Sequence, residues 1–148
     1  TYYEDKWFPY TMPISDITGL RAAVDNVVAE KDMVDRHAKI AAATRKAVTE
    51  AGLKLYLESG YSNTVTVIEV PEGLTDQQIL STMRDKYNVM ISGCFDVLAG
   101  KVIRIGHMGE NANIEDMALT FDAMDKTFAD LGYPLACSRK ETFLEAVK

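Results

Sequence analysis

A positive charge lies inside an apolar run in the second half of the chain, and the run stops at a pair of glycines. Residues 101–109 read KVIRIGHMG, with Arg104 among β-branched side chains and glycines at positions 106 and 109. β-Branched residues favour a strand, and glycine permits the tight backbone turn that ends one. The segment therefore predicts a strand with an arginine near its tip, followed by a tight loop.

The arginine itself suggests a kind of chemistry. Its guanidinium is a planar fork of N–H donors, which matches a carboxylate or a phosphate in a bidentate manner. Arg104 is therefore a candidate anion site. The alternative interpretation is an edge strand whose arginine simply points into water. The residues alone leave both interpretations open.

Hydrophobic spacing along the chain predicts alternating helices and strands. Helices are expected over residues 14–31, 32–51 and 114–132, after Thr75, and after Ser138; strands are expected over residues 53–57, 64–70, 89–92 and 101–105. Thr75 and Gln78 have the spacing of a capping box, in which each side chain binds the other residue's backbone amide. The order of elements predicts an α+β fold with a mostly antiparallel sheet and helices packed on one face.

Composition favours one globular domain over residues 1–148, with residues 1–13 as a connecting or interface arm. The chain has 148 residues, of which 47% are hydrophobic and 26% charged, a common size for a single core. Its net charge of −6 and the lack of a basic cluster argue against nucleic-acid binding, and no apolar run approaches the roughly 20 residues of a membrane span. Cys94 and Cys137 are interpreted as reduced thiols of a cytoplasmic protein.

The histidines are the other candidates for chemistry. His37 lies beside Arg36 on a polar helix face and is interpreted as solvated. His107 lies between two glycines, and is either a functional side chain in an unusual loop or an imidazole that caps the next helix. No cysteine or carboxylate joins the histidines at metal-ligand spacing, so no metal site is predicted.

Several segments together resemble the class V aminotransferases, the pyridoxal-phosphate enzymes of the alanine–glyoxylate and serine–glyoxylate type. The similar segments occur in the expected order: residues 10–14 (YTMPI), 19–23 (GLRAA), 36–37 (RH), 62–66 (SNTVT), 70–73 (VPEG) and 104–109 (RIGHMG). The resemblance runs from about residue 8 to about residue 131. It covers only the small carboxy-terminal domain of the family.

The resemblance implies roles for particular residues. Arg104 corresponds to the arginine that binds the α-carboxylate of the amino-acid or 2-oxo-acid substrate. Thr11 corresponds to a threonine that reaches across a homodimer interface to the cofactor phosphate of the other subunit. The family commonly has a tyrosine at the position of Phe8, and Tyr10 is a weak substitute for its hydroxyl. Gly93 follows a serine where many relatives have a second glycine.

The resemblance also implies that the catalytic lysine is missing. The family's Schiff-base lysine lies upstream of Thr1, in a large pyridoxal-phosphate-binding domain, and the chain has no initiator methionine. We therefore expect the carboxy-terminal part of an aminotransferase, inactive and without bound cofactor when isolated. The alternatives are a free-standing regulatory or small-metabolite-binding module, with Arg104 as its anion anchor, and a structural interaction domain.

Overall fold

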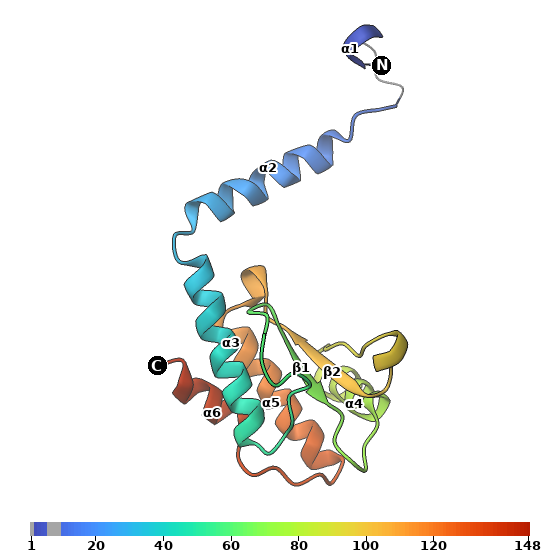
Figure 1. The fold of residues 1–148 in the computed structure, drawn as a ribbon, viewed down its shortest axis with the longest axis vertical. Helices are drawn as coiled ribbons and strands as arrows, with labels where there is room; N and C mark the ends of the chain where they lie inside the picture. Colours follow the sequence, from blue (N-terminus) through green and yellow to red (C-terminus); the bar gives the residue numbers. More distant parts are fainter. Residues whose placement is uncertain (1, 6–9) are drawn as a thin grey trace. The chain divides into compact units, whose positions relative to one another are not determined.

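The computed structural model describes residues 2–5 and 10–148, and these fall into two units (Figure 1). The first unit runs to Met33 and contains helices α1 (Tyr2–Asp5) and α2 (Ile14–Ala29). The second unit is Val34–Lys148. Each unit is treated by itself, and a single domain over residues 1–148 stays a prediction.

The second unit alternates helices with short strands. Its elements are α3 (Met33–Glu50), β1 (Val65–Glu69), α4 (Asp76–Tyr87), the 3₁₀ turn η1 (Asp96–Leu98), β2 (Val102–Gly106), the 3₁₀ turn η2 (Gly109–Asn111), α5 (Ile114–Asp130) and α6 (Arg139–Ala146). Every helix expected from the hydrophobic spacing is present, with ends within a few residues of the prediction. Within the described ranges, no helix is long and apolar enough to cross a membrane.

Two of the four predicted strands do not form strands in the structure. Strands β1 and β2 form an antiparallel pair, and the segments 53–57 and 89–92 join it through one bridge each, Leu55 to Ile68 and Ser92 to Arg104. The pairing is this short because segment 53–57 leads into a loop that turns at Gly60, whose φ is +73°, and segment 89–92 is followed by a second loop at Gly93. Both segments nevertheless flank the sheet as expected.

The sheet has one buried face and one partly open face. Because successive residues of a strand point to opposite faces, the register that pairs Ile68 with Ile103 also pairs Val67 with Arg104 on the other side. Ile68 and Ile103 are fully buried in the core, whereas Val67 and Arg104 are half-buried. Side chains from α3, α4, α5 and α6 complete that core. The α+β fold with antiparallel pairing is therefore confirmed.

The capping box at Thr75 is also confirmed. The Thr75 hydroxyl accepts a hydrogen bond from the Gln78 amide at 3.2 Å, and the Gln78 side chain accepts one from the Thr75 amide at 2.9 Å. These bonds satisfy backbone donors that the first turn of α4 leaves without helical partners. They define where α4 begins, directly after the loop that follows β1.

An ion pair anchors α6 to α5. The carboxylate of Asp125 accepts hydrogen bonds from Arg139 Nε at 2.8 Å, from the Ser138 hydroxyl at 2.9 Å and from the Lys140 amide at 3.3 Å. The Arg139 side chain is fully buried, and its guanidinium lies 4.3 Å from the centre of the Phe128 ring. Burial lowers the pKa of Arg139, and the hydrogen bond that Arg139 donates to Asp125 opposes this change. Asp125 thus compensates a desolvated charge.

Replacing Asp125 by Ala is expected to lower the free energy of unfolding of the chain by about 3 kcal/mol, because the buried Arg139 loses its counter-charge. Asp122→Ala is the matched control: Asp122 lies one turn earlier on α5, and its partners Lys126 and Lys140 are more exposed. Surface pairs of this kind contribute about 0–1 kcal/mol. Urea unfolding of both variants measures the difference, and equal losses would contradict this account.

Candidate anion-binding site

The backbone of Arg104 is paired on both sides, although β2 is one of only two strands in the sheet. Its backbone pairs with Val67 of β1 on one side and with Ser92 on the other, where the Arg104 amide donates to the Ser92 carbonyl at 2.6 Å. Glycine at position 106 ends the strand. The interpretation of Arg104 as a residue whose side chain points into water therefore stays open, and the side chain projects from the partly open face of the sheet.

The guanidinium of Arg104 makes a hydrogen bond through Nε, and its two terminal nitrogens face away from that bond. Its Nε donates a hydrogen bond to the Gly93 carbonyl at 2.7 Å, and the Phe95 ring centre lies 5.9 Å from the guanidinium carbon. The Arg104 side chain makes no other hydrogen bond or ion pair in the part of the chain that the structure describes. Both terminal nitrogens, Nη1 and Nη2, therefore remain available, which suits end-on binding of a carboxylate or phosphate.

The loop that supplies the Gly93 carbonyl comes close to α4. A Cβ at Gly93 would lie 3.3 Å from a methyl carbon of Leu80 and 3.5 Å from a carboxylate oxygen of Asp76, so a larger residue crowds this position. Farther along, Asp96 has a φ of +51°, which is uncommon for a residue with a side chain. Phe95 and Val97 on either side of it are strongly exposed. The loop thus places one exposed aromatic ring, that of Phe95, near the guanidinium.

His107 is a buried residue of the core and not a helix cap. It is fully buried, and its Nε2 forms a hydrogen bond of 2.9 Å with the Thr66 hydroxyl of β1. The side chain that caps α5 belongs to Asn113, whose Oδ1 accepts from the Asp116 amide at 2.8 Å. Burial lowers the pKa of His107, and nearby backbone groups only partly oppose the shift. The interpretation of His107 as a capping residue is wrong.

Arg36 and His37 also differ from the sequence interpretation. His37 is half-buried, and its Nε2 accepts a hydrogen bond from the Gly109 amide at 2.9 Å. Arg36 donates to the carbonyls of Gly109 and Ala112. Both residues therefore bind residues 107–113, which we call the β2–α5 loop. These contacts join positions more than 70 residues apart in the sequence, and no local pattern signals them.

The two residues predicted to approach a cofactor lie in the first unit. Thr11 is exposed, and Tyr10 has 85% of its surface accessible. No side chain caps the first turn of α2, which begins just after Thr11 and Pro13. Phe8 lies outside the described residues. The structure thus groups Arg104 with Gly93 and Phe95, whereas Tyr10 and Thr11 belong to another unit.

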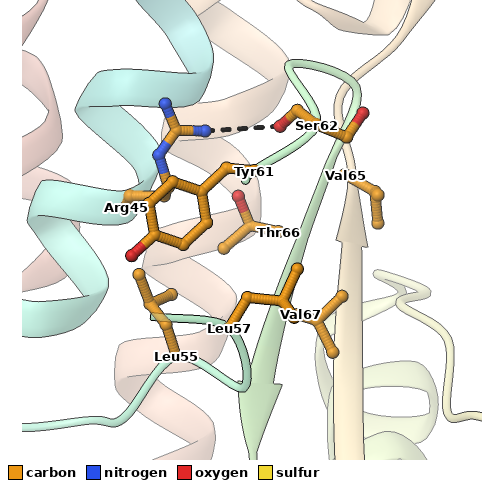
Figure 2. A pocket seen from close by; sticks show the side chains of 8 residues that line it. All are labelled: Arg45, Leu55, Leu57, Tyr61, Ser62, Val65, Thr66 and Val67. Atoms are coloured by element: carbon orange, nitrogen blue, oxygen red, sulfur yellow. Dashed lines mark hydrogen bonds between the residues drawn. The ribbon is translucent and has the colours of Figure 1, made fainter. Parts of the chain in front are cut away.

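A small cavity between α3 and the loop before β1 is unsuited to a substrate (Figure 2). Its volume of about 60 Å³ has room for only a few water molecules. The Arg45 guanidinium lies 4.8 Å from the centre of the Tyr61 ring and donates to the Ser62 carbonyl at 3.3 Å. These contacts fasten the loop to α3. Among the described residues, no group of three or more metal-ligating side chains gathers at this or any other place.

Comparison with known proteins identifies relatives along almost the whole chain. An uncharacterised aminotransferase of Methanocaldococcus jannaschii is 35% identical over 99% of this chain and 38% of its own length. A serine–glyoxylate aminotransferase of Arabidopsis thaliana is 36% identical over 87% of this chain and 33% of its own length. The crystal structure of a pyridoxamine–pyruvate aminotransferase from Mesorhizobium loti superposes with a TM-score of 0.87 at 31% identity, covering 97% of this chain and 38% of that protein. No protein-family model matches the chain.

The chain is therefore related to the class V aminotransferases, as its sequence segments predict. It spans less than two-fifths of the length of the relatives described above. The Mesorhizobium structure also supports the α+β fold, because it superposes on nearly the whole chain.

The pH dependence of stability tests the burial of His107. Its pKa is lowered in the folded chain, whereas an unfolded histidine has a pKa of about 6.5. The unfolded state therefore binds more protons between these values. Stability should be complete above about pH 6.5 and should fall as the pH drops from there toward the folded pKa.

The measurement compares the wild-type chain with His107→Gln, which keeps a polar side chain but cannot titrate. We expect the free energy of unfolding to fall less between pH 8 and pH 5 in the variant, and the difference between the two curves isolates His107. Parallel curves would show that the imidazole titrates as it does in water.

Proposed function

We propose that this chain is the carboxy-terminal part of a pyridoxal-phosphate-dependent aminotransferase. The whole enzyme transfers an amino group between an amino acid and a 2-oxo acid, such as alanine or serine with glyoxylate or pyruvate. It acts in the cytoplasm as a homodimer, in which a large domain of the same polypeptide completes each site. The relatives of the chain support the reaction class. The observation that carries the proposal is the open Nη edge of Arg104 on a partly open sheet face.

Arg104 binds the substrate carboxylate in this proposal. The two terminal nitrogens donate one hydrogen bond to each carboxylate oxygen, and the Gly93 carbonyl keeps the guanidinium from rotating. Amino-acid and 2-oxo-acid substrates share this carboxylate, so a single arginine serves both halves of the reaction. Holding the carboxylate at a fixed point orients the rest of the substrate and removes much of the entropic cost of reaction.

The cofactor is pyridoxal phosphate, which supplies the electron sink that amino-group transfer needs. The residues that would approach its phosphate are Thr11 and, more weakly, Tyr10, acting on the neighbouring subunit. Thr11 fits this role because its exposed side chain lies just before the first turn of α2, whose backbone amides no side chain caps, and the start of a helix favours an anion. Asp16 in the same turn carries a negative charge that opposes a phosphate there. Such a site therefore depends on groups from the other subunit.

Arg104→Lys in the whole enzyme tests the assignment. Lysine keeps the charge but loses the fork, so a desolvated carboxylate is left poorly paired. We expect kcat/KM to fall for the amino acid and the oxo acid alike, by about 2–5 kcal/mol of transition-state stabilisation. Arg84→Lys on α4 is the control, because Arg84 is exposed and its side chain pairs with the adjacent Asp85. Unchanged kcat/KM for both substrates in Arg104→Lys would overturn the proposal.

The isolated chain is expected to form no specific covalent link with pyridoxal phosphate. Among the described lysines none is buried: all are exposed except Lys140, which is half-buried and paired with Asp122. None of them therefore lies in the desolvated pocket that activates a lysine as a nucleophile. After incubation with the cofactor and borohydride reduction, mass spectrometry should find only scattered, substoichiometric labelling. One stoichiometric adduct at a single lysine would contradict the expectation.

A further inference from the structure

The loop that precedes β2 is compact and lies close to α4 at both of its ends. It consists of residues 93–100, which we call the 93–100 loop. Within it, the Leu98 amide donates a hydrogen bond to the Phe95 carbonyl at 3.2 Å. Cβ atoms added to the glycines at its two ends would lie 3.5 Å and 3.9 Å from carboxylate oxygens of Asp76, in the first turn of α4. The backbone that carries Phe95 is therefore held in a defined position.

Phe95 differs from the other phenylalanines that the structure describes. Phe121, Phe128 and Phe143 are fully buried, whereas Phe95 keeps 79% of its surface exposed. The next residue, Asp96, has a φ of +51°, and a residue with a side chain keeps such a conformation only where the surrounding structure enforces it. The loop thus holds a large aromatic ring in an exposed position instead of packing it into the core.

The exposed ring lies beside the candidate anion site. Its centre is 5.9 Å from the guanidinium carbon of Arg104, and the Gly93 carbonyl of the same loop accepts from Arg104 Nε. A carboxylate bound end-on places its own carbon about 4 Å from the guanidinium carbon. The ring and the carboxylate would therefore be neighbours of the same guanidinium. Val67, the cross-strand partner of Arg104, adds a second apolar side chain nearby.

Apolar neighbours change the strength of a charge pair. The attraction between a guanidinium and a carboxylate grows when water around them is displaced, because the effective dielectric constant falls. A pair that stays in water is weak and is screened by salt. Arg104 is only half-buried, so a side chain that covers its water-facing part would strengthen its pair with a substrate. Phe95 is an exposed apolar side chain in contact with it.

We propose that Phe95 is a substrate-binding residue that shields the pair between Arg104 and the substrate carboxylate from water. The inference rests on the proposed function, because it takes Arg104 as the carboxylate anchor. The ring lies against the bound carboxylate and displaces water from it. The carboxylate keeps its charge throughout the reaction, so the shield stabilises the bound substrate and the transition state alike. It therefore lowers KM and leaves kcat nearly unchanged.

Phe95→Ala in the whole enzyme gives the direct test. The KM for alanine and the KM for glyoxylate should each rise about fivefold, the effect of losing one aromatic contact to a charged group, with kcat nearly unchanged. Acetate carries a carboxylate but neither an amino nor an oxo group, so it probes the anchor alone. Its competitive inhibition constant should rise by the same factor. Phe95 is exposed, so the variant should fold normally.

The salt dependence of acetate binding gives a second measurement. Removing the ring leaves the pair open to screening ions. Raising the KCl concentration from about 0.05 M to about 0.5 M should therefore weaken acetate inhibition more in Phe95→Ala than in the wild-type enzyme. An equal salt dependence of the two enzymes would overturn the exclusion of water as the role of Phe95.

Val97→Ala is the matched control. Val97 lies in the same loop with the same exposed fraction of 79%, but it has no ring beside the guanidinium, so its loss should leave KM and acetate inhibition unchanged. Phe95→Leu keeps an apolar side chain and should retain most of the binding. Equal effects of Val97→Ala and Phe95→Ala, or of Phe95→Leu and Phe95→Ala, would contradict the proposed shield.

The outcomes separate this inference from the proposed function. If Arg104→Lys impairs the reaction of both substrates while Phe95→Ala leaves KM and acetate inhibition unchanged, the shield is refuted and the carboxylate site stands. If Phe95→Ala lowers kcat and leaves KM unchanged, the ring does not act in binding and the shield is again refuted. If Arg104→Lys has no effect, the proposed function fails and this inference fails with it.

Discussion

The antiparallel pairing of β1 with β2 determines the role of every residue along β2. The register of these two strands places Ile103 and Ile105 in the core, where they pack against side chains of the helices. Burial of such side chains contributes roughly 1.5–3 kcal/mol each, so a shift by one residue is strongly disfavoured. The same register necessarily places Arg104 on the opposite face. The core thus fixes the direction of the candidate anion site without any contact to a ligand.

Much of this arrangement follows from local sequence. Helical spacing predicts the helices because each buries one continuous stripe, and the capping box at Thr75 marks a helix start through bonds between neighbouring residues. The anion-binding interpretation of Arg104 follows from a charge within a β-branched run. The relatives of the chain agree with the family that the order of its short segments indicates.

The features that the sequence does not reveal all depend on distant contacts. Segments 53–57 and 89–92 have strand-like composition, but the number of residues that pair is decided by neighbours elsewhere in the fold. Likewise, His37 looks solvated on its own helix and becomes a hydrogen-bond acceptor only because Gly109 folds against it. The burial of His107 depends on Thr66, 41 residues earlier. Such pairs have no spacing that a single sequence displays.

Two arginines of the same unit show what distinguishes a structural charge from a binding charge. Arg139 is fully buried, faces an aromatic ring and is neutralised by Asp125, so its charge serves the packing of α6. Arg104 is also fixed in place, but by a backbone carbonyl at Nε, and it pairs with no carboxylate in the described part of the chain. A carbonyl orients the guanidinium without cancelling its charge. Arg104 therefore keeps both a defined geometry and an unneutralised charge, which are the properties that recognition of an anionic substrate requires.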